Sequence, residues 1–318
     1  MKLLVHYDHP ERVRDVLRKR LADVPVSWCR DYASLPALLE HEKPDVLFTV
    51  RFAGSEAFPR EAIRASRSLR WISVGGSGTD HLGMWDSTRL TVTNAAGVGA
   101  ETMAQYALAA MLHFTLGLPA FATRQRERRW APGRVASVAG RTLAILGLGK
   151  TGQSTAKLAK ALGLSVIGIR AHPQPTPSVD RVEPTVRLPD ILAEADFVLV
   201  CLPLTAATRG LIDKAAFAAL KPGAVLIDVS RGGIVRQDAL IETLSSGRLR
   251  GAALDVFEIE PLPADSPLWH MENVIVTPHS SSVYDGWERR AMEMFCDNAE
   301  RWQRGEPLEN IVDPHRGY

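Results

Sequence analysis

Short apolar runs alternate with stretches of helical spacing over the first 97 residues of the chain. The apolar runs, which have the length of buried strands, are residues 3–6, 45–50 and 71–74. Helical patterns lie between them at residues 12–21, 35–41 and 60–66. Short strands that alternate with helices predict a parallel sheet covered by helices on both faces.

A second series of alternations begins at Arg141 and is more regular than the first. Its six predicted strands are residues 142–146, 164–169, 196–201, 224–229, 251–255 and 273–276. Predicted helices lie between strands at residues 152–162, 213–220 and 237–246. This order is typical of a doubly wound nucleotide-binding sheet. A long amphipathic helix at residues 283–304 then leads the chain back to the first domain.

The segment between the two series predicts one strong helix followed by an exposed arm. Residues 100–116 are apolar nearly all round, so we expect this helix to be buried, with part of it at an interface. Gly117 and Pro119 end the helix. Residues 124–134, RQRERRWAPGR, include an acidic residue and only one aromatic, which favours a surface or dimer-contact segment over nucleic-acid binding.

Composition narrows the class of protein. The 318 residues suffice for two domains, and 46% hydrophobic with 23% charged residues is the profile of a globular protein. A formal net charge of +2 predicts no nucleic-acid or membrane-surface partner, and no apolar run approaches the ~18 residues of a membrane span. Cys29, Cys201 and Cys296 have no metal-ligand or disulfide spacing. Together with an N-terminus unlike a secretory signal, these features predict a cytoplasmic enzyme without a metal.

A glycine-rich turn follows the first strand of the second series. Gly147, Gly149 and Gly152, with Lys150 and Thr151 between them, fit the G-x-G-x-x-G pattern, and the turn opens a predicted helix, as a dinucleotide site requires. Gly147 permits the tight turn, Gly149 lets the backbone approach a pyrophosphate, and Gly152 lets the helix pack closely on the strand. Unpaired N–H groups at the helix N-terminus then attract the phosphates.

The residue at the end of the next strand bears on which cofactor is bound. A site for NAD(H) has Asp or Glu there to bind the ribose 2′-hydroxyl, whereas this chain has Arg170, about 20 residues past the glycines. A guanidinium attracts a 2′-phosphate and binds it with paired hydrogen bonds. We therefore expect NADP(H) to be preferred, with NAD(H) still possible, and His172 to assist Arg170.

Three predicted strands deliver ionisable side chains into the loops that follow them. Arg231 lies in the segment LIDVSRGG, Glu260 in GAALDVFEIEPL and His279 in NVIVTPHS. Open α/β sheets bind ligands beyond the carboxyl ends of their strands, so we expect these residues to converge. An imidazole that titrates near neutral pH, a carboxylate and a permanently charged guanidinium are suited to proton transfer beside a bound anion.

These segments, with GLGKTG and CLPLTAATRGLID, closely resemble those of the D-isomer-specific 2-hydroxyacid dehydrogenases, on the glyoxylate and hydroxypyruvate reductase side of that family. The resemblance covers residues 69–312. It implies an α/β protein of two doubly wound parallel-sheet domains. A Rossmann cofactor domain, residues 99–284, would be inserted into a flavodoxin-like substrate domain, residues 1–98 and 285–318. It also implies a homodimer formed through the buried helix and the arm.

The resemblance assigns roles to individual residues. Arg231 would anchor the substrate carboxylate and polarise the keto oxygen, while His279 would be the general acid/base. Glu260 would hold the imidazole, and it matches better than Glu258 because it directly precedes Pro261. Asp255 would bind the nicotinamide carboxamide. The other residues that would contact the cofactor are Leu202, Pro203 and Thr208.

A second match lies in the first domain, in the segment WISVGGSGTDHL. It resembles the family's substrate-side glycine loop. Consecutive backbone N–H groups in such a loop can bind a carboxylate, and Gly76, Ser77 and Gly78 are the candidates. Arg51, which follows the predicted strand 45–50, is a candidate for contacting the rest of the substrate.

Two features depart from the commoner pattern of the family. Asp228 stands where asparagine is frequent. Ser280, Ser281 and Ser282 follow His279 where small apolar residues are usual. Neither departure alters the three ionisable residues after the strands, but both bear on the contacts made with the cofactor.

The sequence thus predicts an NADP(H)-preferring enzyme that interconverts a small 2-keto acid, such as glyoxylate or hydroxypyruvate, and its D-2-hydroxy acid. A larger 2-keto acid, 2-ketogluconate-like or aromatic, is the alternative substrate. The alternative class is a dinucleotide-sensing, corepressor-like protein, because some relatives of this family act in that way. Turnover of a 2-keto acid with either cofactor separates the two classes.

Overall fold

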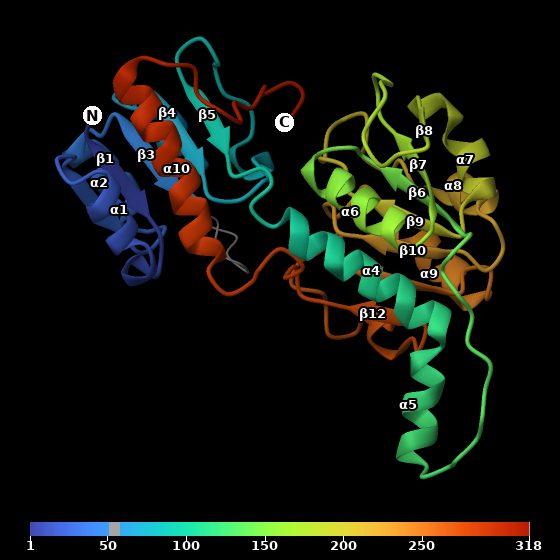
Figure 1. Cartoon of the computed structure of the whole chain (residues 1–318). Coiled ribbons are helices and arrows are strands. Elements are labelled where there is room, and N and C mark those ends of the chain that lie inside the picture. The colour runs from blue at the N-terminus through green and yellow to red at the C-terminus, as the bar shows by residue number, and fades with distance from the viewer. Residues whose placement is uncertain (51–57, 318) are drawn as a thin grey trace. The chain divides into compact units, whose positions relative to one another are not determined.

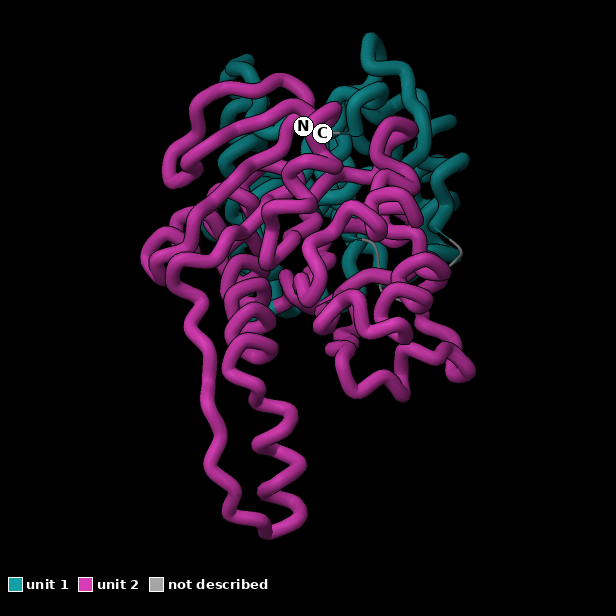
Figure 2. Tube along the Cα trace, turned by 90° about the vertical axis from the view of Figure 1, so that its right-hand side faces the viewer, with its two compact units in different colours: residues 1–98, 284–318 teal, residues 99–283 magenta. Residues whose placement is uncertain are grey.

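The computed structural model describes residues 1–50 and 58–317, and the chain forms two compact units. Unit 1 consists of Met1–Val98 and Tyr284–Tyr318, and unit 2 consists of Gly99–Val283 (Figure 2). The chain therefore crosses from one unit to the other twice. Arg51, the candidate for contacting the substrate, lies outside the described residues.

Unit 1 is built on a five-stranded parallel sheet (Figure 1). Its strands are β1 (Leu3–His6), β2 (Val26–Cys29), β3 (Val46–Thr49), β4 (Trp71–Val74) and β5 (Thr91–Asn94). The order across the sheet is β2-β1-β3-β4-β5, which is the flavodoxin-like order and confirms the expected fold. The central strands β1, β3 and β4 are buried throughout, as their unbroken apolar runs predicted.

The sequence patterns missed both edge strands of this sheet. β2 reads Val-Ser-Trp-Cys, with three half-buried residues, and β5 reads Thr-Val-Thr-Asn. An edge strand is less enclosed than a central one, so it need not form the continuous apolar run that marks a buried parallel strand. The last residues of the chain run beside β5: the Asn94 N–H donates to the Asn310 carbonyl, and the Val312 N–H donates to the Val92 carbonyl.

Four α-helices of the described residues cover the two faces of this sheet. They are α1 (Arg14–Arg20), α2 (Leu35–Glu42), α3 (Arg60–Ala65) and α10 (Trp287–Arg304). α1 and α10 share one hydrophobic cluster with the sheet, and α2 and α3 share another. Phe295 of α10 packs on Trp71 and Phe48, with ring centroids 5.2 and 5.3 Å away. α10 begins later than the expected residue 283, after Gly286, whose φ is +93°.

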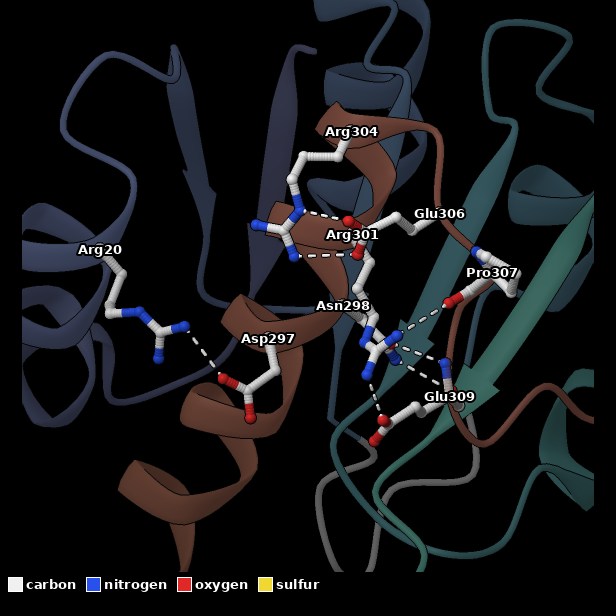
Figure 3. Close-up of polar contacts among 8 residues, drawn as sticks. All are labelled: Arg20, Asp297, Asn298, Arg301, Arg304, Glu306, Pro307 and Glu309. Carbon is white, nitrogen blue, oxygen red and sulfur yellow. Dashed lines mark hydrogen bonds and ion pairs between the residues drawn. The ribbon is translucent and has the colours of Figure 1, made fainter.

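Polar contacts fasten the end of α10 to its surroundings (Figure 3). The Asn298 side chain is buried and binds both backbone groups of Glu309. Its Nδ2 donates to the Glu309 carbonyl at 2.9 Å, and its Oδ1 accepts from the Glu309 N–H at 2.8 Å. Arg301 donates to the Glu309 carboxylate, and Asp297 accepts from Arg20 of α1. These contacts turn the chain back after the helix, toward β5.

Unit 2 is built on a seven-stranded parallel sheet. Its strands are β6 (Thr142–Leu146), β7 (Ser165–Ile169), β8 (Arg181–Glu183), β9 (Phe197–Val200), β10 (Val225–Asp228), β11 (Gly251–Leu254) and β12 (Val274–Val276). The order across the sheet is β12-β11-β10-β9-β6-β7-β8, which is the Rossmann order, as expected. All strands are parallel, and the order in which they are added reverses between β6 and β9. The sequence patterns missed only the edge strand β8, because Arg-Val-Glu is short and polar.

The helices of unit 2 correct the sequence analysis in two places. They are α4 (Ala100–Leu116), α5 (Leu118–Arg126), α6 (Lys150–Ala161), α7 (Leu188–Glu194), α8 (Lys214–Ala219) and α9 (Gln237–Ser245). α7 was not predicted. The arm expected after residue 117 begins as a second helix, α5, with Pro119 in its first turn, where proline is tolerated. No single helix of the described residues has the length and apolarity to cross a membrane; only α4 and α5 together do, and they are bent by 65°.

Candidate active site

The glycine-rich turn joins β6 to α6 and leaves the start of the helix open. Gly147 has a φ of +104°, and a Cβ on Gly152 would lie 2.1 Å from the Gly147 carbonyl oxygen, so a larger residue at either position would force a rearrangement. A Cβ on Gly149, in contrast, would meet nothing within 4 Å. Backbone N–H groups in the first turn of α6 are therefore open to an anion. Lys150 and Thr151, both in that turn, complete a cradle that fits a dinucleotide pyrophosphate.

Two further segments of unit 2 lie where a bound dinucleotide is expected. Arg170 directly follows β7, and no ion pair among the described residues involves its guanidinium. The loop after β9 folds on itself, because the Thr208 hydroxyl donates to the Pro203 carbonyl at 2.6 Å. Leu202 of this loop lies against the glycine turn, with a methyl carbon 3.2 Å from the position of a Cβ on Gly147.

The loops after β10, β11 and β12 bring three ionisable residues to one edge of the sheet. These strands are parallel neighbours, so their carboxyl ends meet there. Nδ1 of His279 lies 2.9 Å from Oε2 of Glu260. Oε1 of Glu260 accepts the Phe257 N–H at 3.0 Å, so both carboxylate oxygens are engaged. Glu260 thus holds one ring nitrogen of His279 and leaves Nε2, on the opposite side of the ring, for another partner.

The electrostatics of Glu260 connect it to Arg231 as well. Burial by itself would raise the pKa of Glu260, but the hydrogen bond and charge of His279, the Phe257 N–H and the charge of Arg231 together lower it below its ordinary value. Glu260 is therefore ionised at neutral pH. The Arg231 guanidinium donates from Nη1 to the Ser230 carbonyl at 2.8 Å. An anionic carboxylate, an imidazole and a guanidinium at one edge can bind an anion and move a proton.

The loop that carries His279 is held by Asp255. His279 has a φ of +50°, uncommon for a residue with a side chain, and its N–H donates to the Asp255 carbonyl at 2.9 Å. The Asp255 carboxylate accepts the Ser280 N–H at 2.8 Å and both the N–H and the hydroxyl of Ser281, at 3.0 and 2.5 Å. It also accepts the Thr277 hydroxyl at 2.7 Å. The described contacts of Asp255 therefore position the loop that carries His279, and the contact of Asp255 with a carboxamide stays a prediction.

This network contains residues that sequence reasoning missed. The Thr277 hydroxyl lies 3.0 Å from the Tyr106 hydroxyl of α4. Burial raises the pKa of Tyr106 to about 12, so this hydroxyl keeps its proton at neutral pH. The serines after His279 were the one available signal, because a buried aspartate needs hydrogen-bond donors and Ser281 supplies two of them.

The glycine loop of unit 1 follows β4. The Ala95 N–H donates to the Gly76 carbonyl at 3.0 Å, and Nδ2 of Asn94 donates to the Ser77 carbonyl at 2.6 Å. A trans peptide group places its N–H opposite its carbonyl, so the N–H groups of Ser77 and Gly78 point away from these partners. The loop can therefore offer adjacent N–H groups to an anion. Asn94, which holds it, is a second residue that the sequence analysis did not identify.

The described residues of the predicted site thus fall into two groups. Arg231, Glu260 and His279 lie at one sheet edge of unit 2, together with the expected cofactor residues. Gly76, Ser77 and Gly78 belong to unit 1. No cluster of His, Cys, Asp and Glu among the described residues could hold a metal ion. A Rossmann sheet with an open glycine turn, and an imidazole–carboxylate pair beside an arginine, define the class of nicotinamide-dinucleotide-dependent oxidoreductases.

Comparison with known proteins specifies the class. A family model described as "D-isomer specific 2-hydroxyacid dehydrogenase, NAD binding domain" matches residues 108–281. The chain belongs to the D-isomer-specific 2-hydroxyacid dehydrogenase family, as the motifs indicated. The glyoxylate reductase of Korarchaeum cryptofilum is 33% identical over 264 residues, which cover 80% of this chain and 79% of that protein.

Other relatives carry different names. The D-3-phosphoglycerate dehydrogenase of Methanocaldococcus jannaschii is 32% identical over 281 residues, which cover 87% of this chain and 53% of that protein. The chain thus spans about half the length of that relative. A solved structure of an NADPH-dependent glyoxylate/hydroxypyruvate reductase from Sinorhizobium meliloti, in complex with NADP and sulfate, has a TM-score of 0.86 and 27% identity and covers 100% of both chains.

Proposed function

We propose that this protein is an NADP(H)-preferring reductase of a small 2-keto acid of the glyoxylate or hydroxypyruvate type. The observation that carries the proposal is the 2.9 Å contact between His279 and Glu260, which leaves Nε2 of the imidazole available, while the charge of Arg231 acts on the same carboxylate. That arrangement suits an anionic substrate that must receive a proton as its keto group is reduced. Unit 2 is then the cofactor domain, and unit 1 the substrate domain.

The cofactor would be held by the glycine turn and by the end of β7. The open backbone at Gly149 and the N-terminus of α6 would bind the pyrophosphate, and Arg170 would bind the 2′-phosphate that distinguishes NADP(H) from NAD(H). When bound, the nicotinamide supplies or accepts a hydride. The complex of the Sinorhizobium meliloti reductase with NADP supports this choice of cofactor.

The residues that follow β10, β11 and β12 would bind the substrate and transfer the proton. Arg231 would bind the substrate carboxylate and draw electron density toward the keto oxygen, since a guanidinium keeps its charge at any physiological pH. The protonated His279 would donate from Nε2 to that oxygen, and in the reverse direction Nε2 would remove the hydroxyl proton. Glu260 would keep the ring oriented and stabilise its charged form.

The glycine loop of unit 1 would bind a carboxylate group of the substrate. The carbonyls of Gly76 and Ser77 are held by Ala95 and Asn94, so adjacent N–H groups are presented on the other side of the backbone. Adjacent N–H donors of this kind suit a carboxylate.

The names of the relatives differ in the substrate that they give. The names of the Korarchaeum and Sinorhizobium proteins favour glyoxylate or hydroxypyruvate. The Methanocaldococcus relative favours a phosphorylated three-carbon acid, but this chain spans 53% of that protein. We therefore propose the small unphosphorylated acids as substrates and treat 3-phosphohydroxypyruvate and larger 2-keto acids as competitors in the assay.

The test is a panel of 2-keto acids, assayed with NADPH and with NADH. We expect the highest kcat/KM for glyoxylate or hydroxypyruvate with NADPH. His279→Ala should lower kcat at least about 100-fold, because it removes the general acid, while NADPH binding persists. His270→Ala, which removes an exposed histidine of the same unit, is the matched control and should leave kcat unchanged. Absence of turnover with every acid and both cofactors would overturn the proposal.

We also propose that the enzyme is a homodimer formed through α4, α5 and residues 127–134. α5 buries none of its residues, and it projects from the rest of unit 2 together with the segment that follows it (Figures 1 and 2). Leu118 is 46% exposed and Trp130 is 96% exposed. Apolar surface of this kind marks a protein contact. The partner proposed is a second copy of the chain.

Sedimentation velocity of the full chain tests the dimer. Trp130→Asp should shift the dimer toward monomer, because it places a charge in the contact. Val186→Asp alters another highly exposed apolar residue of unit 2, 82% exposed, and should leave the dimer intact. A monomeric wild-type protein, or a dimer that is equally sensitive to both substitutions, would contradict this assignment.

A further inference from the structure

A buried carboxyl that the proposed chemistry does not use lies three residues before Arg231. Asp228 is the last residue of β10 and is 3% exposed. Its Oδ1 accepts the Ser230 N–H at 3.0 Å and also the Ser230 hydroxyl. The Ser230 carbonyl in turn accepts Nη1 of Arg231 at 2.8 Å. Asp228 therefore holds Ser230, and the guanidinium contacts the carbonyl of that same residue.

A second buried carboxyl lies beside the first. β10 and β11 are parallel neighbours, and the N–H of Asp255 donates to the Asp228 carbonyl at 3.0 Å. The two side chains differ in the donors they receive. Asp255 has donors from Thr277, Ser280 and Ser281, whereas the contacts of the described residues give Asp228 only those of Ser230. Two like charges close together in a buried place disfavour each other, and Asp228 has the fewer donors to stabilise a charge.

Several neighbouring groups shift the pKa of Asp228. Burial raises the pKa of Asp228 to about 7; the Ser230 bonds oppose the rise, Asp255 adds to it, and Arg231 opposes it. Cys201, after β9, and Tyr106, of α4, face the same carboxyl, and both have pKa values raised mainly by their own burial. Neither is charged at neutral pH. Arg231 and Asp255 are thus the charged groups that act on Asp228.

We propose that Asp228 is a positioning residue for Arg231 and that it supports substrate binding as the neutral acid. In that form Asp228 orients Ser230 through hydrogen bonds and leaves the charge of Arg231 to the substrate carboxylate. As the anion, Asp228 competes with the substrate for the same positive charge. Substrate affinity therefore falls as Asp228 ionises. Asp228, Gly232 and Phe257 are among the residues that line one pocket.

The inference rests on the proposed role of Arg231, so its test uses binding as well as turnover. The probe is oxalate, a small dicarboxylate, titrated calorimetrically into the full chain with NADP⁺ present. For the wild type we expect the Kd of oxalate to rise about fivefold or more between pH 6 and pH 8.5, the lower end of typical coupling between two ligands. Asp228→Asn keeps the acceptor for Ser230 but does not titrate, so its Kd should change less than twofold.

Turnover separates positioning from catalysis. In the wild type the KM of the keto acid should follow the same pH dependence as the Kd of oxalate. Asp228→Asn should weaken this dependence of KM, while the pH dependence of kcat persists. Ser230→Ala removes one donor but leaves the carboxyl, so it should weaken oxalate binding at every pH and retain the pH dependence. A Kd that depends on pH as strongly in Asp228→Asn as in the wild type would overturn the proposal.

Thermal unfolding gives a readout that needs no ligand. Asp228 binds its proton more tightly when folded, so between its ordinary pKa near 4 and about 7 the folded chain holds a proton that the unfolded chain has lost. Wild-type stability therefore falls relative to Asp228→Asn as the pH rises through this window. The difference between their Tm values should grow by about 5 °C or more from pH 5 to pH 8.

The outcomes distinguish this inference from the proposed function. A constant Tm difference means that Asp228 does not titrate in this range, and the inference fails whatever the substrate. A growing Tm difference with a pH-independent Kd means that Asp228 titrates without affecting Arg231, and the inference fails too. Failure of oxalate to bind removes Arg231 as a carboxylate site and overturns both proposals. Normal oxalate results without turnover of any keto acid overturn the proposed function alone.

Discussion

Replacing Gly232 by alanine probes how closely two loops of the sheet edge must approach each other. Gly232 directly follows Arg231 in the loop after β10. A Cβ on Gly232 would lie 1.8 Å from the carbonyl oxygen of Phe257, in the loop after β11. The N–H of Phe257 donates to Glu260, which holds His279. One added methyl group therefore forces the loop that carries Arg231 away from Phe257, whose N–H holds the Glu260 carboxylate.

The size of the displacement follows from the contact. Cβ atoms essentially never approach another heavy atom closer than 3.0 Å, and the Cβ of Gly232→Ala would lie 1.8 Å from the Phe257 oxygen, so the two loops must separate by at least 1.2 Å. The neighbouring atom is backbone, so no side-chain rotation relieves the clash. A misplacement of about 1 Å can cost about 100-fold in rate. We therefore expect kcat/KM for Gly232→Ala to fall about 100-fold.

Steady-state kinetics with the best keto acid of the panel measures this loss. NADPH binding, followed by fluorescence, should persist, because the glycine turn after β6 is unchanged. Thermal unfolding of the same preparation checks that the variant is folded, since overpacking a tight site costs about 1–3 kcal/mol. A folded Gly232→Ala variant with kcat/KM within about threefold of the wild type would refute the claim that this close approach aligns the three ionisable residues.

The remaining predictions concern the cofactor and the substrate loop. Arg170→Asp should lower the ratio of kcat/KM for NADPH to that for NADH about 100-fold, because it replaces a charge-assisted pair with a repulsion; an unchanged ratio would show that the 2′-phosphate is bound elsewhere. Asn94→Ala removes the hydrogen bond to the Ser77 carbonyl and should raise the KM of the keto acid about 5-fold to 10-fold with little change in kcat, as loss of one hydrogen bond implies. An equal fall in kcat would instead indicate a role in the chemical step.

Most strands of the fold could be predicted from the sequence, because most of them lie inside a sheet. The central strands of both sheets are mostly apolar and buried, and the glycine turn directly follows one of them. Burial on both faces of a parallel sheet imposes that pattern. The edge strands β2, β5 and β8 lack it, because each mixes polar with apolar residues, and β5 does so although three of its four residues are buried. The helix α5 was missed because it buries none of its residues, so no apolar stripe marks it.

Some residues of the candidate site could likewise be predicted from the sequence, and others could not. Arg231, Glu260 and His279 were found because each stands in a recognisable segment after a strand. Asn94, Thr277 and Tyr106 were not, because their contacts join positions far apart in the sequence. The hydroxyls of Thr277 and Tyr106, for example, lie 171 residues apart along the chain and 3.0 Å apart in space.

The sequence by itself determined the chemical types present and the order in which the strands deliver them, because apolar periodicity and glycine spacing are local properties of the chain. Only the tertiary structure decided which oxygen faces which nitrogen. It turned Asp255 toward the His279 loop and buried Asp228 beside it, so that two aspartates that look alike in the sequence differ in the donors they receive. Such differences arise from solvent exclusion and from neighbours on adjacent strands, which exist only once the sheet has formed.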